Sequence, residues 1–258
     1  MKYYIISGEA SGDLHASNLM KGLKMRDAEA DFRCWGGDLM QAEGAELVKH
    51  YRDLAFMGFA EVLMNIRTIL RNMKFCKQDI LEYKPDVLIL VDYPGFNLRI
   101  AKFAAEQGIR VFYYISPQIW AWKKSRVHKI KKYVDRMFVI LPFEKDFYAR
   151  YDFNVDFVGH PLLDAIDHEL KDDGFREKSN LDDKPVIAIL PGSRKQEIAK
   201  MLPVMLGMKK HFPGYQFVIA AAPSAPESFY DAARGIKDVS IIKGKMHDVL
   251  RISEAAMV

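Results

Sequence analysis

The segment Asp92–Asn97 places a carboxylate directly after a short apolar run. It reads Asp-Tyr-Pro-Gly-Phe-Asn and follows Val87–Val91. An uninterrupted apolar run is typical of a parallel strand buried on both faces, and open α/β sheets bind ligands at the carboxyl ends of such strands. A carboxylate there can accept a proton from a hydroxyl group, so Asp92 is a candidate general base. The alternative is a turn in which Asp92 bonds its own backbone before Pro94, and this segment supports both interpretations equally.

A second polar segment, Ser7–Asp13, follows the first apolar run of the chain and precedes a helical pattern. It reads Ser-Gly-Glu-Ala-Ser-Gly-Asp. Glycine lets the backbone turn sharply, and the free amides at a helix start favour an anion. The glycine spacing is not that of a dinucleotide fingerprint. A plain strand-to-helix turn with Ser11 or Asp13 as N-cap is the interpretation that this segment favours on its own.

The segment Ser116–Trp122 combines two tryptophans with a following basic stretch. It reads Ser-Pro-Gln-Ile-Trp-Ala-Trp, and lysines, an arginine and a histidine follow in 123–132. Trp120 and Trp122 suit a pocket wall or an interfacial anchor, and the basic cluster could hold phosphate. For most of the lysines, the solvated face of an amphipathic helix is the simpler interpretation. No nucleic-acid-binding module accompanies the cluster, so we expect no nucleic-acid partner.

The segment Leu190–Arg194 reads Leu-Pro-Gly-Ser-Arg and lies between an apolar run and a helical pattern. Gly192 and the amides that follow it can surround a diphosphate, and Arg194 can neutralise the charge with planar donors. A plain loop is the alternative. Because the segment opens a second nucleotide-fold-like region, we expect it to bind phosphate.

These segments lie in a regular alternation of strand and helix patterns, which predicts a doubly wound α/β architecture with right-handed crossovers. The predicted strands are Tyr3–Ser7, Phe32–Trp35, Val87–Val91, Val111–Ile115, Met137–Leu141, Val155–Val158, Val186–Leu190, Phe217–Ala221 and Val239–Ile242. The predicted helices are Leu14–Arg26, Phe59–Tyr83, Phe96–Gln107, Phe143–Tyr151 and Glu197–His211.

A polar stretch interrupts this alternation and predicts two domains. We expect an N-terminal Rossmann-like domain over 1–163, a connection over 164–184, and a second domain over 185–258. The second domain has room for three strands, and the apolar run Ala255–Val258 is typical of the start of another. We therefore expect the second domain to be incomplete.

Composition limits the other classes of function. The chain has 258 residues, 38 Lys and Arg against 34 Asp and Glu, and two cysteines. The small positive excess suits an anionic substrate or an anionic bilayer face. Cys34 and Cys76 form neither a metal-ligand pattern nor a disulfide framework, which favours a reducing cytosol. We find no signal peptide and no apolar stretch near the ~20 residues that span a bilayer, and expect a soluble or peripheral protein.

The predicted helix Phe59–Tyr83 carries one apolar face and a separate basic group. Core packing explains the apolar face most simply. The alternative is that part of this face contacts acyl chains while Arg67, Arg71 and Lys74 lie near lipid phosphates. The sequence does not separate the two.

Taken together, the motifs resemble those of the lipid-A-disaccharide synthase family over essentially every residue present. In order along the chain, the matching segments are Gly8–Asp13, Ala55–Gly58, Asp92–Asn97, Ser116–Trp122, Leu141–Glu144, Gly159–Pro161 and Leu190–Arg194. The resemblance implies a GT-B fold, with two Rossmann-like domains and a cleft between them. It also implies transfer of a sugar from UDP-2,3-diacylglucosamine to 2,3-diacylglucosamine 1-phosphate, with a β-1,6 link, inversion and release of UDP.

The resemblance further implies roles for individual residues. Asp92 would deprotonate the acceptor 6-hydroxyl, and Gly192, Ser193 and Arg194 would bind the UDP diphosphate. No metal or other cofactor is expected. The enzyme would work at the cytoplasmic face of the inner membrane, and the full-length protein could form a homodimer. The residues expected on the acceptor side of the cleft are Glu9, Ser11, Asp13, Asn97, Ser116, Gln118, Trp120 and Trp122.

Two alternatives remain at this stage. Another GT-B protein that uses a UDP-N-acetylglucosamine-type donor, either a transferase or a 2-epimerase, would keep the diphosphate loop. Neither is expected to show the Ser116–Trp122 motif. The second alternative is a non-catalytic lipid-binding module.

Overall fold

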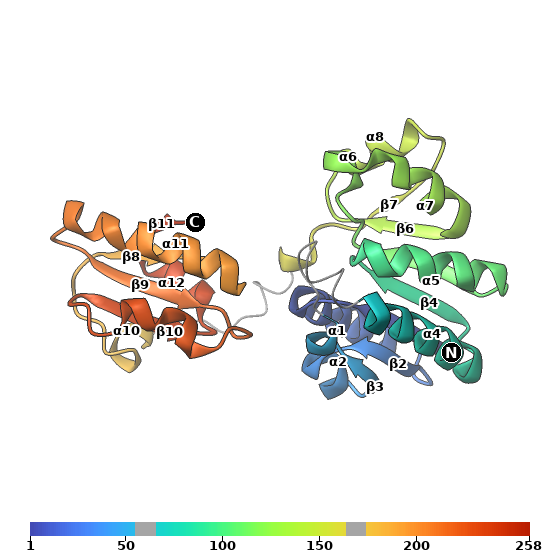
Figure 1. Ribbon diagram of the computed structural model, residues 1–258, viewed down its shortest axis with the longest axis horizontal. Helices are drawn as coiled ribbons and strands as arrows, with labels where there is room; N and C mark the ends of the chain where they lie inside the picture. The colour runs from blue at the N-terminus through green and yellow to red at the C-terminus, as the bar shows by residue number, and fades with distance from the viewer. Residues whose placement is uncertain (55–65, 164–173) are drawn as a thin grey trace. The chain divides into compact units, whose positions relative to one another are not determined.

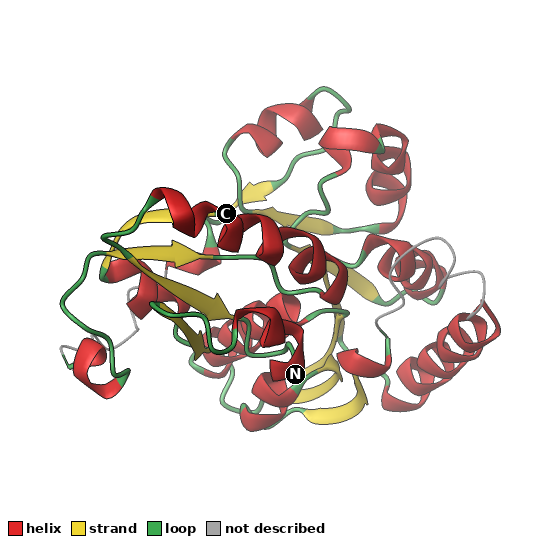
Figure 2. Cartoon of the chain, turned by 60° about the vertical axis from the view of Figure 1, so that its left-hand side comes forward, coloured by secondary structure: helices red, strands yellow, loops and turns green. Residues whose placement is uncertain are grey.

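The computed structural model describes residues 1–54, 66–163 and 174–258. The chain forms two compact units, residues 1–164 and 165–258. Each contains a parallel β-sheet with helices packed against it (Figures 1 and 2). The predicted Ala55–Gly58 motif and the first residues of the predicted helix Phe59–Tyr83 lie outside the described residues.

The first unit is built on a seven-stranded sheet with the order β3-β2-β1-β4-β5-β6-β7. All its strand pairs are parallel. The order runs outward in both directions from the β1–β4 pair, which defines a doubly wound fold with its switch point between these strands. The strands are β1 (Lys2–Ser7), β2 (Asp31–Gly36), β3 (Glu46–His50), β4 (Val87–Val91), β5 (Arg110–Tyr114), β6 (Arg136–Val139) and β7 (Asp156–Phe157).

Alternate residues of these strands enter two separate cores, because successive side chains point to opposite faces of a sheet. Tyr3 and Ile5 pack in the core beneath α1 and α2. Tyr4 and Ile6 pack in the larger core beneath α4, α5, α7 and α8. The helices of this unit are α1 (Ala10–Lys24), α2 (Asp38–Ala42), η1 (Tyr51–Asp53), α4 (Ile66–Tyr83), α5 (Pro94–Glu106), α6 (Ile119–Trp122), η2 (Lys124–Arg126), α7 (Val127–Tyr133) and α8 (Phe143–Ala149).

The second unit has a four-stranded parallel sheet with the order β10-β9-β8-β11. Its switch point lies between β8 and β11. The strands are β8 (Val186–Ile189), β9 (Gln216–Ala221), β10 (Val239–Lys243) and β11 (Ser253–Met257). The helices are α10 (Phe175–Lys178), α11 (Lys195–Gly207), η3 (Met208–His211), η4 (Glu227–Ala233) and α12 (Met246–Arg251).

The predicted architecture is confirmed, and each predicted strand is found within about two residues of its expected bounds. β3 was not predicted. It lies at the edge of the sheet, and its residues are only partly buried or exposed, so its sequence lacks the apolar run that identifies the central strands. The run Ala255–Val258 does contribute to a strand, β11, so the described second unit contains four strands rather than three.

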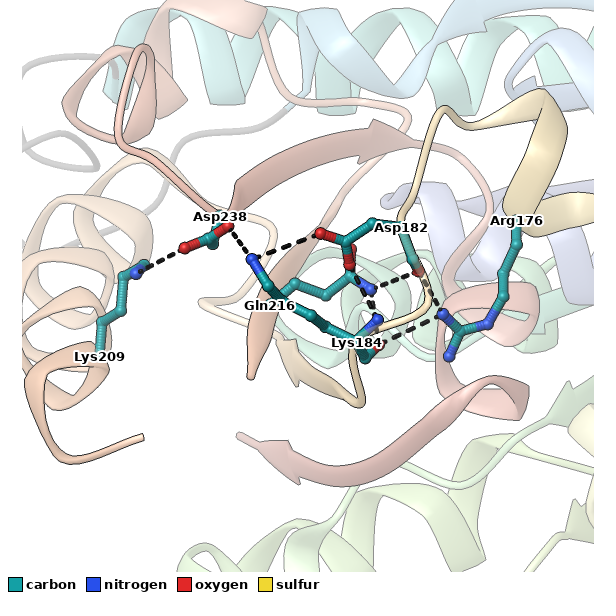
Figure 3. Close-up of polar contacts among 6 residues, drawn as sticks. All are labelled: Arg176, Asp182, Lys184, Lys209, Gln216 and Asp238. Carbon is teal, nitrogen blue, oxygen red and sulfur yellow. Dashed lines mark hydrogen bonds and ion pairs between the residues drawn. The ribbon is translucent and has the colours of Figure 1, made fainter. Parts of the chain in front are cut away.

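The described part of the predicted connection belongs to the second unit. Phe175 of α10 is buried in the core of that unit with Val186 and Val218. Figure 3 shows the polar contacts that hold the segment after α10. Gln216 donates to the carbonyls of Asp182 (2.9 Å) and Lys184 (2.6 Å), and the Lys184 ammonium pairs with Asp238. These residues lie where β8, β9 and β10 begin, so the network stabilises the segment that leads into β8.

Within the ranges that the structure describes, no helix combines the length and the apolar composition that crossing a bilayer requires.

Candidate active site

The switch point of the first unit brings two predicted site segments together. β1 and β4 are neighbours, and Ser7 is in register with Val91. Gly8 and Glu9 therefore leave the sheet beside Asp92 and Tyr93. Open α/β sheets bind their ligands at this position, outside the carboxyl ends of the strands where the order reverses.

The backbone at Asp92 and Tyr93 adopts an unusual conformation. Both residues are left-handed, with φ of 42° and 47°. Two successive non-glycine residues in this region cost roughly 1–3 kcal/mol each, so the surrounding structure must hold them. The Asn97 side chain supplies part of that support, because its Nδ2 donates to the carbonyls of Asp92 (2.8 Å) and Val91 (3.2 Å). The hydroxyl of Tyr113 also donates to the Asp92 carbonyl.

The Asp92 carboxylate is suited to proton transfer near neutral pH. Solvent reaches the side chain, although protein atoms surround much of it. This partial desolvation, together with the negative charge of Glu9, raises the pKa of Asp92 to about 6. A carboxylate with such a pKa is a stronger base than an ordinary aspartate, and it is still ionised at pH 7.

Gly8 is required because the Tyr93 ring lies against it. A Cβ atom at position 8 would overlap the Tyr93 ring carbons. The Tyr93 ring also stacks on Phe96, with centroids 5.6 Å apart, and its hydroxyl donates to the Leu54 carbonyl (3.3 Å). The two loops of the site are therefore packed directly on each other, which fixes the position of Asp92 relative to Glu9.

The Asp13 side chain is buried in the first unit, at the start of α2. It is only 3% exposed. Its carboxylate accepts hydrogen bonds from the backbone amides of Gly37 (2.8 Å), Leu39 (3.1 Å) and Met40 (3.1 Å), at the start of α2. Asp13 thus caps α2 from another helix, since free amides at a helix N-terminus favour an anion. Ser11, by contrast, is exposed in the first turn of α1.

Asn97 is also turned inward. It is fully buried, and its amide nitrogen bonds the ends of β1 and β4. Its Oδ1 is buried without a hydrogen-bond partner among the described residues. In this structure Asn97 supports the Asp92 turn rather than facing solvent.

The Ser116–Trp122 motif contributes residues with three different environments. Ser116 is buried, and its hydroxyl lies 2.7 Å from that of Tyr148. Trp120 is partly buried and packs edge-on against Phe143 (5.0 Å). Gln118 and Trp122 are exposed, so within this motif they are the side chains most open to a ligand or a surface.

Trp122 is the most exposed aromatic side chain of the motif, at 66%. The Lys123 ammonium and the Arg126 guanidinium lie over its ring, 5.2 and 5.4 Å from the centroid. An exposed tryptophan with adjacent cations is typical of an anchor at a polar–apolar interface.

The sequence did not predict a role for Tyr113, which supports the Asp92 turn, or for Glu144, which supports the turn between β6 and α8. Tyr113 is one of several aromatic residues in an apolar run, and nothing in the local pattern distinguishes its hydroxyl. Glu144 is buried and accepts from the amides of Ile140 (3.2 Å) and Leu141 (3.0 Å), which closes the turn between β6 and α8. The Leu141–Glu144 motif could have signalled this turn, because a glutamate in a first helical turn often caps it.

In the second unit, Gly192, Ser193 and Arg194 form the exposed turn between β8 and α11. Gly192 is left-handed (φ 99°), and a Cβ atom there would meet the Glu197 side chain. Glu197 accepts hydrogen bonds from the amides of Ser193 and Arg194, both at 3.2 Å, and its other oxygen pairs with the Arg194 guanidinium (3.1 Å). These bonds outweigh partial desolvation and hold the pKa of Glu197 below its ordinary value.

The amides predicted to bind a diphosphate therefore have a carboxylate bound to them in this structure. A diphosphate at the same amides would displace Glu197 and gain Arg194 as a partner. In the part of the chain that the structure describes, no three His, Cys, Asp or Glu side chains gather closely enough to hold a metal ion.

Comparison with known proteins identifies the family. A model of the lipid-A-disaccharide synthetase family matches residues 3–258. The lipid-A-disaccharide synthase of Trichlorobacter lovleyi is 38% identical over 262 residues, which cover 98% of this chain and 68% of the relative. That of Geobacter metallireducens is 40% identical over 259 residues, covering 97% and 67%. The chain thus spans about two thirds of the length of these relatives.

The fold has solved counterparts as well. The UDP-GlcNAc 2-epimerase from Neisseria meningitidis, solved with UDP-GlcNAc bound, matches with a TM-score of 0.67 over 99% of this chain and 77% of that one. At 12% identity this likeness concerns the fold alone, and it agrees with the GT-B architecture. With the family match and relatives near 40% identity, the chain belongs to the lipid-A-disaccharide synthase family of glycosyltransferases.

Proposed function

We propose that the enzyme joins UDP-2,3-diacylglucosamine to 2,3-diacylglucosamine 1-phosphate, with a β-1,6 link, and that Asp92 is the general base of this reaction. The observation that carries the proposal is the Asp92 turn. Asp92, whose carboxyl pKa is raised to about 6, lies at the switch point of the first unit, where the buried Asn97 amide and the buried Tyr113 hydroxyl donate to its backbone carbonyl.

The proposed step is a single displacement. The acceptor 6-hydroxyl loses its proton to the Asp92 carboxylate as its oxygen forms a bond to the anomeric carbon of the donor sugar. The bond between that carbon and the diphosphate oxygen breaks, and UDP leaves with the electron pair. Attack on the face opposite to the leaving group inverts the anomeric configuration. Glu9 supports the step because its charge raises the pKa of Asp92 and so strengthens the base.

The donor diphosphate is proposed to bind the turn Gly192–Arg194. Its amides lie at the start of α11, where the helix dipole favours an anion. Arg194 is exposed and can turn from Glu197 to a diphosphate with two parallel donors. The epimerase counterpart, whose structure holds UDP-GlcNAc, supports a nucleotide sugar as the donor class.

On the acceptor side, the predicted residues that solvent reaches at least in part are Glu9, Ser11, Gln118, Trp120 and Trp122. We propose that these side chains, rather than the buried Asp13 and Asn97, contact the acceptor or the surface from which it comes.

A lipid acceptor and a lipid donor imply work at a membrane, so we propose peripheral association with the cytoplasmic face of the inner membrane through the first unit. Arg67, Arg71 and Lys74 of α4 are exposed, as are Leu70 (56%) and Trp122 (66%). Co-sedimentation with vesicles should require anionic lipid and weaken as salt rises, because each basic residue contributes about 1 kcal/mol within a Debye length.

Product analysis tests the proposed reaction. The full-length enzyme, incubated with both glucosamine lipids, should release UDP and one disaccharide in equal amounts. An epimerised sugar nucleotide without disaccharide would instead support the 2-epimerase alternative, and binding of both lipids without any product would support a lipid-binding module.

A further inference from the structure

A groove on the outer surface of the first unit is lined by basic side chains above an apolar floor. It lies along α5, between α4 and α7, and encloses about 580 Å³. Figure 1 shows α5 between these two helices. The floor includes Met73 and Leu98, each 7% exposed, and the Phe103 ring. None of the proposed reaction residues lines it, so the groove is separate from the Asp92 site.

The charge in the groove is strongly one-sided, although that of the whole chain is nearly balanced. The whole chain has 38 Lys and Arg against 34 Asp and Glu. The groove is lined by five Lys and Arg side chains and by a single carboxylate, that of Glu106. Its Lys and Arg side chains are Lys77, Arg99, Lys102, Lys129 and Lys132. This excess makes the groove complementary to an anion.

The cations of the groove are only partly engaged within the protein. Lys77 lies over the Phe103 ring (5.1 Å), and Lys102 approaches Glu106 (3.7 Å) with both side chains 55% exposed. Exposed pairs of this kind contribute little to stability and release their partners easily. Arg99 and Lys129 are exposed and form no side-chain bond or ion pair with any described residue. They are therefore available to a phosphate.

The rim of the groove on α4 adds an apolar edge. Leu70 lines the groove and is 56% exposed, and Ile66, one turn earlier on the same face of the helix, is 43% exposed. Basic side chains around a groove with an apolar floor and an exposed apolar rim fit an amphiphile better than a purely polar anion. A volume near 580 Å³ suits one headgroup with the first part of its acyl chains.

We propose that this groove binds the headgroup of an anionic phospholipid, with the phosphate between Arg99 and Lys129 and the lipid backbone on Leu98 and Phe103. This inference rests on the peripheral association proposed above and adds to it a saturable site distinct from the reaction site. Single-stranded nucleic acid, by comparison, needs a longer basic track with exposed rings for base stacking.

Two double variants with the same charge change test the site. Arg99→Gln with Lys129→Gln alters the groove, and Arg67→Gln with Arg71→Gln alters α4 outside it. The probe is dihexanoyl-phosphatidylglycerol at concentrations where it is monomeric, followed by the chemical shifts of backbone amides. We expect saturable shifts in α5 and α7, with affinity reduced ~10- to 30-fold in the groove variant and unchanged in the α4 variant.

Several results would overturn the proposal. Equal losses in both double variants would indicate diffuse attraction, and equal binding of dihexanoyl-phosphatidylcholine would indicate an apolar groove without a phosphate site. Displacement of the lipid by inorganic phosphate at a similar concentration would indicate a free-anion site. Displacement by a short oligonucleotide at lower concentration would indicate a nucleic-acid site.

The membrane proposal can fail independently. If the protein does not sediment with phosphatidylglycerol vesicles but still binds the short-chain lipid in the groove, peripheral association is refuted and the groove site stands. If it sediments with vesicles and the short-chain lipid leaves α5 and α7 unshifted, the groove site is refuted.

Discussion

The Tyr113 hydroxyl on β5 donates a hydrogen bond to the backbone carbonyl of Asp92, at the end of the neighbouring strand β4. Tyr113 is fully buried, and the Asn97 amide donates to the same carbonyl. Two donors on one carbonyl fix the plane of the peptide after Asp92. They stabilise a left-handed conformation that aspartate tolerates and tyrosine rarely adopts. The proposed base is thus positioned through its backbone.

Tyr113→Phe should therefore lower turnover more than the removal of a buried hydroxyl that does not contact the Asp92 turn. Tyr4→Phe is the matched control, because Tyr4 is also fully buried and its hydroxyl donates to Asp79 instead. Each variant should lose about 1–2 kcal/mol of stability, measured by urea unfolding. Turnover of the full-length enzyme should fall roughly 5- to 10-fold in Tyr113→Phe alone, the effect of about 1 kcal/mol on the barrier. Equal turnover in the two variants would refute the positioning role.

Asp92→Asn should lower turnover of the full-length enzyme by ~10²–10⁴-fold while leaving the fold intact, because the amide cannot accept the proton. The wild-type enzyme should also lose activity as the pH falls through about 6, since protonation of Asp92 removes the base. Steady-state kinetics across this pH range measure both effects.

Glu9→Gln provides the control for the pH dependence. The negative charge of Glu9 contributes to the raised pKa of Asp92, so its removal should move the acid limb of the pH profile to lower pH. An acid limb that stays in place in Glu9→Gln and persists in Asp92→Asn would assign the titration to another group.

The sequence predicted the sheet and the position of Asp92 well, because both depend on local signals. Buried parallel strands such as Val87–Val91 are apolar without interruption, and a carboxylate after such a strand lies at the ligand-binding edge. The direction of each side chain was less predictable. Ser11 and Asp13 lie two residues apart, yet one is exposed and the other is buried against α2.

Long-range contacts explain this difference. Asp13 finds the amides of α2, a five-residue helix with no strong pattern of its own. Asn97 and Tyr113 meet at the Asp92 carbonyl only because β4 and β5 are neighbours. Residue spacing within one segment contains no information about such pairings, so the support of the site could not be predicted.

Asp13→Ala should destabilise the first unit rather than weaken acceptor binding. The change leaves three amides at the start of α2 without their carboxylate, at a cost of ~2–4 kcal/mol. Asp38→Ala is the control, because that exposed side chain lies 3.4 Å from a His50 ring nitrogen and 3.3 Å from the Arg52 guanidinium, and its loss should change stability by less than about 1 kcal/mol.

Tryptophan fluorescence in urea measures these effects selectively. All three tryptophans, Trp35, Trp120 and Trp122, lie in the first unit. If Asp13→Ala unfolds at the same urea concentration as the wild type but no longer binds the acceptor, Asp13 has the predicted role in acceptor binding.

Arg194→Ala and Glu197→Gln should change the affinity for UDP in opposite directions. Arg194→Ala removes a charged donor to the diphosphate and should weaken binding by roughly 1.5–3 kcal/mol. Glu197→Gln removes the carboxylate that now accepts the amides of Ser193 and Arg194. UDP should then bind roughly fivefold more tightly, because about 1 kcal/mol of like-charge repulsion at an exposed site is lost. Calorimetry on the full-length enzyme measures both, with Glu177→Gln on α10 as a control for net charge. If Glu197→Gln binds UDP no better than Glu177→Gln does, the diphosphate does not occupy the Ser193 and Arg194 amides, and the turn is a plain helix cap.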